Sequence, residues 1–270
     1  MNKTKIEWCD MTWNPVTGCL HGCGYCYARK IAERFGGGGY GIEMGMFISK
    51  YKEGVFQPPY DLAEPQFAKT KNDWYREAPY PYGFEPTFHR YRLDEPQKVK
   101  KPQNVFVCSM ADLFGDWVPD EWVKQVFEAC KKAPQHRYLF LTKNPERYCN
   151  VLKRIDAADN FWFGTTITND EMPFFWSDKH NTFLSIESLQ SDFKEKEILN
   201  SYVREVFVDW VIIGAETGNR KGKVTPKREW IENIVNYCRE MNVPVFMKDS
   251  LAKVWGGPLI REYPWGDQNA

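Results

Sequence analysis

The sequence predicts an α/β fold in which helices cover a parallel sheet. Three observations lead to this prediction. Short, fully apolar segments recur along the chain, amphipathic segments at helical spacing separate them, and most apolar segments end in polar residues. A length of 270 residues with 43% hydrophobic residues is enough for one large α/β domain, so we expect a single domain over residues 1–270.

The N-terminal third is expected to hold one strand, one helix and an insertion. The strand is predicted within residues 12–18, and apolar residues at helical spacing follow it: Tyr27, Ala28, Ile31, Ala32 and Phe35. Four glycines at 36–39 then suggest a hinge. The stretch to about residue 101 is rich in Pro, Tyr and Phe and has little periodicity. We interpret residues 36–101 as an irregular insertion over the active-site face, because its apolar residues are too few for a core.

A regular alternation of strands and helices begins at residue 104. Strands are predicted at 105–108, 138–141, 161–166, 183–186, 210–213 and 243–247. Helices are predicted at 119–133, after Asn144, which is the expected N-cap, and from Thr225-Pro226 onward. With the first strand, this pattern gives six strands plus one extra.

Composition and charge restrict the function classes. Acidic and basic residues balance at 36 each, which excludes a basic field over the whole protein for binding nucleic acid. No segment has the length of a membrane span, and no targeting peptide opens the chain, so we expect a cytoplasmic protein without membrane contact. Eight cysteines in such a chain are expected to be reduced rather than paired in disulfides.

The strongest motif is the run from Cys19 through Cys23 to Cys26, with C-x3-C-x2-C spacing and Tyr25 before the last cysteine. Three thiolates can hold a 4Fe–4S cluster while one iron keeps an open position for chemistry. Two alternatives remain. A structural zinc site would recruit Cys9 or His21 as its fourth ligand. An iron–sulfur electron carrier would normally have all its irons bound by the protein.

Polar residues follow most of the predicted strands. They are Ser109 to Asp112, Thr142-Lys143, Thr165-Thr166 with Asn169, Ser185 and Glu187, Gly214 to Gly218, and Lys248-Asp249. Such residues often only cap helices or meet solvent. In a parallel α/β barrel, however, the chemistry gathers at the carboxyl ends of the strands, so we expect these residues to converge on the cysteine loop.

The cysteine loop resembles that of the radical SAM superfamily. Longer segments resemble a phage-associated radical-SAM-type family of unassigned activity; they are residues 12–19, 26–28, 109–114, 141–147 and 213–218. The resemblance implies a partial (β/α)6 TIM-type barrel with an extra strand, as one radical-SAM-like domain with the insertion at 36–101. It also implies a 4Fe–4S cluster on Cys19, Cys23 and Cys26, with S-adenosylmethionine (SAM) as the second cofactor.

The resemblance also implies SAM contacts. Ser109 and Asp112 lie where the methionine amino group is held, and Thr166 and Asn169 lie where the ribose hydroxyls are bound. Gly214 and Glu216 belong to a run that loosely resembles the adenine-side pattern, and Lys143 is expected to meet the SAM carboxylate or a substrate anion. The Gly-Gly-Glu run of many superfamily members is absent; Ser109 to Asp112 stand in its place.

The expected activity is that of a radical SAM enzyme. An external flavodoxin- or ferredoxin-like donor supplies one electron, SAM is cleaved to a 5′-deoxyadenosyl radical, and the radical removes hydrogen from an unidentified substrate. The phage-associated family suggests a nucleotide or nucleic acid by analogy. Basic clusters at 98–101 and 220–228 and aromatic residues of the insertion are candidate contacts. Trp8, Trp13, Tyr25 and Tyr27 are expected to keep the cluster dry.

Overall fold

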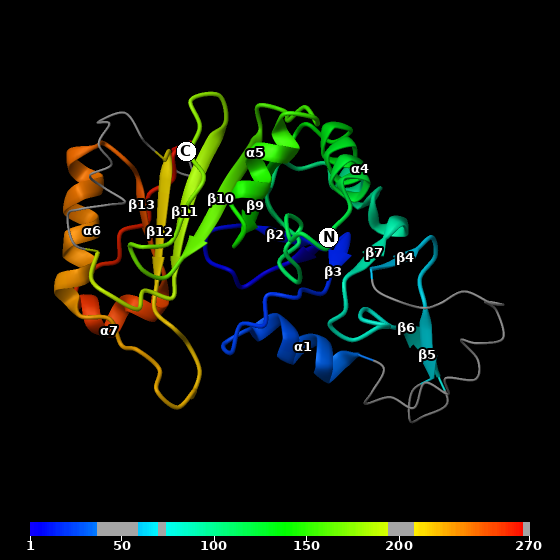
Figure 1. The fold of residues 1–270 in the computed structure, drawn as a ribbon, viewed down its shortest axis with the longest axis horizontal. Coiled ribbons are helices and arrows are strands. Elements are labelled where there is room, and N and C mark those ends of the chain that lie inside the picture. Colours follow the sequence, from blue (N-terminus) through cyan, green and yellow to red (C-terminus); the bar gives the residue numbers. More distant parts are fainter. Residues whose placement is uncertain (37–58, 70–73, 194–207, 267–270) are drawn as a thin grey trace.

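The computed structural model describes residues 1–36, 59–69, 74–193 and 208–266. Its main sheet has eight strands in the order β1-β2-β8-β9-β10-β11-β12-β13 (Figure 1). The strands are β1 (Asn2–Lys3), β2 (Met11–Trp13), β8 (Asn104–Val107), β9 (Arg137–Thr142), β10 (Phe161–Ile167), β11 (Asn181–Glu187), β12 (Trp210–Gly214) and β13 (Val245–Met247). Only β1 runs antiparallel to its neighbour, so the predicted α/β class with a parallel sheet is confirmed.

The sheet is open in the part of the chain that the structure describes, because β1 and β13 are its two edges. A closed TIM barrel is therefore not what the main sheet forms. The six-strand partial barrel that the resemblance implies stays a prediction. The extra strand of the prediction corresponds to the seventh parallel strand, since β2 and β8 to β13 run in one direction.

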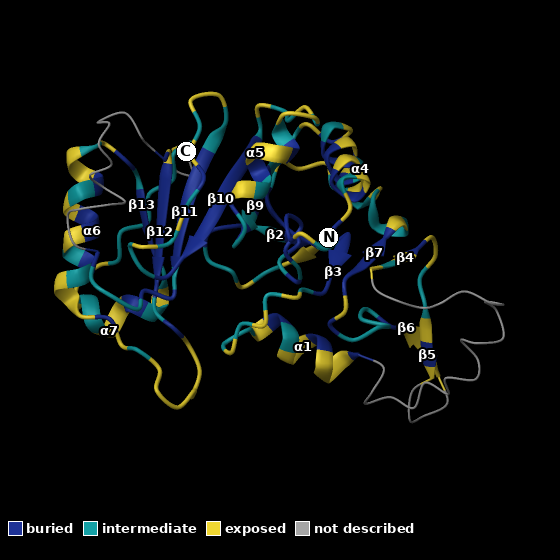
Figure 2. Ribbon diagram, in the orientation of Figure 1, coloured by how far each residue is buried: buried dark blue, intermediate teal, exposed yellow. Residues whose placement is uncertain are grey.

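Helices cover the outer face of this sheet (Figure 2). They are α4 (Asp120–Lys131), α5 (Glu146–Leu152), α6 (Arg228–Glu240) and α7 (Ala252–Trp255), while α1 (Tyr27–Phe35) lies beyond the carboxyl ends of the strands and α3 (Glu95–Lys98) precedes β8. Two helix starts differ from the prediction. The side chain of Asn144 donates to Phe114 O and Asp116 instead of capping α5, and α6 begins at Arg228 rather than at the Thr-Pro pair.

The strands have two different faces because side chains alternate along each strand. In β9, Tyr138 and Phe140 face outward and pack with α4 and α5 in one core cluster. Leu139 faces inward and packs with Trp8, Trp162 and other large rings in a second cluster. The inner face of the sheet is therefore filled with aromatic side chains near the amino ends of the strands.

The strand predicted within residues 12–18 is divided between two sheets. Trp13 ends β2 and pairs with Val107 in the main sheet, whereas Val16 in β3 (Val16–Thr17) pairs with Phe88 in a three-stranded sheet ordered β3-β7-β4. Pro15 separates the two strands and has no N–H to donate to a ladder. The pattern in the sequence could not show this change of partner.

The insertion is more regular than predicted in its described part. It contributes β4 (Tyr60–Leu62) and β7 (Thr87–His89) to the small sheet, and it forms a hairpin of β5 (Phe67–Lys69) and β6 (Tyr75–Glu77). Residues 37–39 of the predicted glycine hinge lie outside the described residues. Two short 3-10 helices, Arg90–Arg92 and Asp249–Leu251, complete the described elements.

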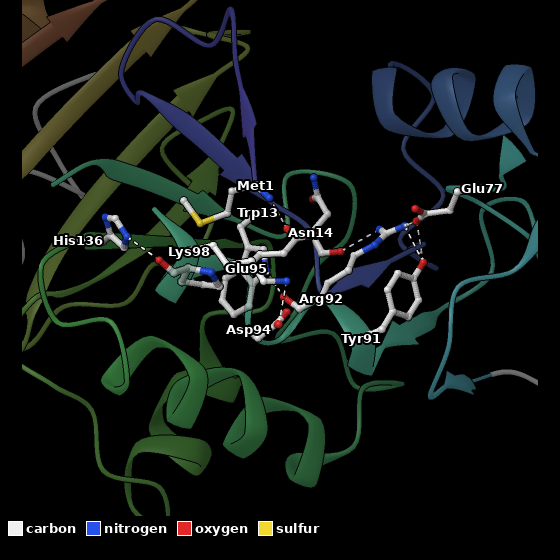
Figure 3. Close-up of polar contacts among 11 residues, drawn as sticks. Met1, Trp13, Asn14, Glu77, Tyr91, Arg92, Asp94, Glu95, Lys98 and His136 are labelled. Atoms are coloured by element: carbon white, nitrogen blue, oxygen red, sulfur yellow. Dashed lines mark hydrogen bonds and ion pairs between the residues drawn. The ribbon is translucent and has the colours of Figure 1, made fainter. Parts of the chain in front are cut away.

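Arg92 ties the insertion to the main sheet (Figure 3). Its guanidinium donates to Asn14 O at 3.1 Å and to Glu77 Oε1 at 3.2 Å, and its own carbonyl accepts from Trp13 Nε1 at 2.9 Å. The Asn14 side chain in turn accepts from the Met110 N–H at 2.9 Å. These hydrogen bonds thus hold the second half of the insertion beside the carboxyl ends of β2 and β8. Among the described helices, none is long and apolar enough to cross a membrane.

Candidate functional site

A cavity of about 280 Å³ lies between the cysteine loop and the carboxyl ends of the parallel strands. Side chains from the loop, from six strand ends and from the insertion line it; they include Cys19, His21, Cys23, Tyr25, Cys26, Phe84, Ser109, Asp112, Thr142, Lys143, Thr166, Glu187, Ser188, Glu216 and Lys248. The volume is near the lower end for small-molecule sites, which span roughly 300–1,000 Å³. The expected convergence of strand ends on the cysteine loop is what the structure displays.

The cavity exists because inward-facing side chains become smaller toward the carboxyl ends of the strands. Trp162, Phe183 and Trp210 fill the amino end of the inner face and are buried. Further along the strands, Gly164 and Gly214 occupy inner positions. A methyl group on Gly164 would lie 2.2 Å from the Phe183 ring, so this glycine makes room for the aromatic floor of the cavity.

The three cysteines of the loop all line this cavity. Cys26 is the N-cap of α1, and its Sγ accepts a hydrogen bond from the Arg29 N–H at 3.4 Å. Burial, with a smaller contribution from the nearby Asp112 carboxylate, raises the pKa of the Cys19 thiol to about 12. A bound metal ion deprotonates such a thiol outright, because the positive charge of the metal stabilises the thiolate.

The arrangement of the thiols is not a closed ligand set. In the described part of the chain, no group of three or more His, Cys, Asp or Glu side chains stands close enough to hold a metal ion. The donor chemistry nevertheless fits an iron–sulfur cluster, since three soft sulfur donors from one loop face one cavity.

The two residues considered as a fourth ligand, Cys9 and His21, lie in different surroundings. Cys9 is buried in the aromatic cluster of the inner face, where desolvation raises the pKa of its thiol well above the usual range. His21 lines the cavity, but its Nε2 is 2.7 Å from Asp112 Oδ2. A zinc site that used Cys9 would have to disrupt this cluster, whereas His21 keeps Nδ1 for a metal ion while its Nε2 contacts Asp112, as metal-bound histidines commonly do.

Asp112 connects the cysteine loop to two strand ends. Its Oδ2 contacts His21 Nε2 at 2.7 Å and accepts from Thr142 Oγ1 at 3.0 Å and from the Lys143 N–H at 2.9 Å. Its Oδ1 accepts from the Phe114 N–H at 3.0 Å. The four protein partners of this buried carboxylate hold the loop in place, and the contact with the methionine amino group that the resemblance implies stays a prediction.

The other predicted SAM contacts divide into two groups. Ser109, Lys143, Thr166 and Glu216 line the cavity with Asp112 and the cysteines. Asn169 does not; its Oδ1 accepts from the Glu171 N–H at 3.1 Å in the loop after β10. Gly214 does not line the cavity either.

Gly214 instead makes room for an ion pair between two of the expected strand-end residues, to which no role at the site was given. Lys248 Nζ lies 2.7 Å from Glu187 Oε2, and both side chains line the cavity. A methyl group on Gly214 would be 3.0 Å from Lys248 Cδ and 3.2 Å from Glu187 Cγ. Both residues follow predicted strands at inward-facing positions, and that alternation is the signal that could have identified them.

Three of the four aromatic residues expected to keep the cluster dry line the cavity, namely Trp8, Tyr25 and Tyr27. Trp13 does not, because it is buried in the core under α4 and α5. Among the rings of the insertion, Phe84 lines the cavity, whereas Phe88 is buried and stacks on Trp122. Phe88 is therefore a core residue and not a surface for stacking bases.

The two basic clusters make local contacts. Lys98 pairs with Asp94 at 2.8 Å on the first of them. In the second, Arg220 binds both carboxylate oxygens of Glu216 at 2.6 and 2.7 Å, and these hydrogen bonds lower the pKa of Glu216. The second cluster thus lies at the cavity, and the first does not line it.

Comparison with known proteins gives one match. A model of the DUF5131 family, described as a protein of unknown function, matches residues 3–257. No curated protein and no solved structure matches the chain. Since the match covers most of the sequence, the chain belongs to the DUF5131 family.

Proposed function

We propose that the protein is a radical SAM enzyme that removes a hydrogen atom from a substrate bound in the cavity at the cysteine loop. The observation that supports this most directly is that three cysteines of one short loop line the same cavity as the polar ends of six parallel strands. In parallel α/β folds, ligands bind at the carboxyl ends of the strands. The cavity is therefore where a cofactor and a substrate would meet.

The residues fit the two cofactors by donor type. Cys19, Cys23 and Cys26 would hold the 4Fe–4S cluster, and three cysteines for four irons leave one iron without a cysteine ligand. Ser109, Lys143, Thr166 and Glu216 offer hydroxyl, ammonium and carboxylate groups toward SAM. When both are bound, they supply reductive cleavage of the sulfur–C5′ bond of SAM and hydrogen-atom abstraction from the substrate.

The chain itself positions the groups and excludes water. Asp112 holds the cysteine loop against the ends of β8 and β9 through His21, Thr142 and Lys143. Trp8 and Phe106 close the cavity floor, where their rings lie 4.7 Å apart. A dry floor of this kind protects a reactive species from side reactions with water.

Metal analysis after anaerobic reconstitution tests this function. We expect bound iron and sulfide in the wild type, and their loss in C19A, C23A and C26A. The matched control is C149A, since Cys149 is an exposed cysteine outside the cavity lining. Zinc without iron, or iron retained in all three variants, would contradict the proposal. The first of these results would favour a structural zinc module.

A further inference from the structure

An apolar stripe runs along the exposed side of α1, directly after the cysteine loop. Tyr27, Ile31 and Phe35 recur every fourth residue and are 52%, 37% and 38% exposed, and Leu20 of the loop is 50% exposed. The opposite side of the helix packs through Ala28 and Ala32 into a small core cluster. Tyr27 also lines the cavity and donates to Ser109 O at 2.9 Å, so the stripe begins at the cavity and is not part of that core.

Basic side chains flank this stripe, and Glu33 is an exposed acidic residue of the same helix. Lys30 and Arg34 are exposed on α1, and the loop after β12 adds Arg220, Lys221 and Lys223, which are also exposed. Figure 1 shows α1 and this loop on the same side of the main sheet, beyond the ends of its strands.

The helix and the loop meet at Glu216. This carboxylate binds Arg220, and the nearby positive charges of Lys223 on the loop and Lys30 on the helix also lower its pKa. Because the whole chain has a formal net charge of zero, the basic rim is a local concentration of charge.

We infer that this surface, formed by Leu20, Tyr27, Ile31 and Phe35 with the basic rim of Lys30, Arg34, Arg220, Lys221 and Lys223, docks an acidic one-electron carrier protein of the flavodoxin or ferredoxin type. The inference rests on the proposed function, which requires such a donor. An acidic rim on the partner would complement the basic one and speed the encounter. Electron-transfer complexes bury small interfaces, below about 1,200 Å² in total, which suits a patch of one helix and two loops.

The position of the surface favours electron transfer to the cysteine loop. Cys26 caps the first turn of α1, and Cys23 lies three residues before it. A carrier seated on α1 would thus lie next to two of the three cluster ligands. In the step itself, the reduced carrier loses one electron and the metal centre gains it, with no bond made or broken.

The apolar residues favour a protein over a nucleic acid as the partner. Single-stranded nucleic acids bind by stacking bases on aromatic rings and by contacts from basic residues to phosphates. Two of the four apolar residues, Leu20 and Ile31, are aliphatic and offer no ring for a base, yet both are exposed.

Charge reversal tests the inference. The variant K30E/R34E would be titrated with an oxidised flavodoxin of net negative charge, using both apoprotein and anaerobically reconstituted protein. We expect affinity for flavodoxin to fall roughly tenfold or more at low salt, with the difference shrinking as salt screens the charges. Reduction of the metal centre by reduced flavodoxin should slow in proportion, whereas reduction by dithionite should not change.

Two controls keep the result specific. K124E/K153E makes the same change of charge at exposed lysines on α4 and after α5, and it should bind flavodoxin like the wild type. I31S removes the centre of the stripe and should weaken binding at all salt concentrations. Unchanged flavodoxin binding in K30E/R34E, or binding of a single-stranded oligonucleotide at this patch in place of flavodoxin, would overturn the inference. If no cluster forms but the apoprotein binds flavodoxin at the patch, the docking surface stands and the proposed function fails.

Discussion

Replacing Asp112 with asparagine tests whether this carboxylate holds the cysteine loop in place. In the wild type, Oδ2 has three partners, His21, Thr142 and Lys143, and Oδ1 accepts from the Phe114 N–H. An amide has only one acceptor oxygen, so its NH2 group must face at least one of these donors. If the amide oxygen takes the position of Oδ2, the buried Phe114 N–H loses its partner.

The cost follows from the burial of Asp112, which is 5% exposed. Leaving one buried donor unsatisfied costs about 1–3 kcal/mol, and losing the charge on the acceptor weakens the remaining bonds. For a chain of this size, each kcal/mol lowers the melting temperature by roughly 2–4 °C, so D112N should melt roughly 2–12 °C below the wild type. Because His21 lies between Cys19 and Cys23, reconstituted D112N should also retain less iron.

The assay is thermal unfolding of the apoprotein together with iron content after reconstitution. D116N is the matched control, since Asp116 is an exposed carboxylate on the same turn with a single side-chain hydrogen bond from Asn144. D116N should leave both quantities unchanged. A D112N variant with the melting temperature and the iron content of the wild type would refute the role assigned to this carboxylate.

Three further predictions concern the structure around the site. Burial lowers the pKa of His89 from 6.5 to about 2, so the folded state keeps this ring neutral while the unfolded chain protonates it below pH 6.5. The free energy of unfolding should therefore fall by about 1.4 kcal/mol per pH unit below that value. In urea unfolding at pH 7 and pH 5.5, the difference in the free energy of unfolding between the two pH values should be smaller for H89Q than for the wild type. G164A should destabilise the protein by about 1–3 kcal/mol, because its methyl group would collide with the Phe183 ring. Thermal unfolding should show that G164A/F183V recovers part of this stability, and additive losses in the double variant would contradict the contact. R92M should lower the free energy of unfolding by about 2 kcal/mol, because it removes the hydrogen bonds to Asn14 O and Glu77. Amide hydrogen exchange should become faster in β3 and β7, and unchanged protection there would show that Arg92 does not anchor the insertion.

The strands β8 to β13 of the main sheet were predictable because each contains a short apolar segment, as expected for a sheet buried on both faces, whereas the polar β1 was not predicted. The predicted 161–166 and 210–213, for example, fall within β10 and β12. The division of residues 12–18 was not predictable, since it depends on Trp13 and Val16 pairing with residues more than seventy positions away. The same limit applies to β4 and β7 of the insertion, which pair with partners 27 or more positions away, but not to β5 and β6, whose partners are six to ten positions apart.

The sequence predicted which residues belong to the candidate site better than it predicted the contacts that those residues make. Polar residues at strand ends identified Asp112 as a site residue, but its partners His21 and Thr142 are 91 and 30 positions away. The local sequence therefore could not show that its carboxylate is fully engaged. Glu187 and Lys248 are 61 positions apart and became a recognisable pair only through the sheet, which places β11, β12 and β13 side by side.

The most direct test of the central claim is electron paramagnetic resonance of the anaerobically reconstituted, reduced protein, recorded with and without SAM. The proposed function predicts a 4Fe–4S signal that changes when SAM is added, because Cys19, Cys23 and Cys26 leave one iron open to the cofactor. The absence of a cluster signal, or a signal that SAM does not alter, would contradict it.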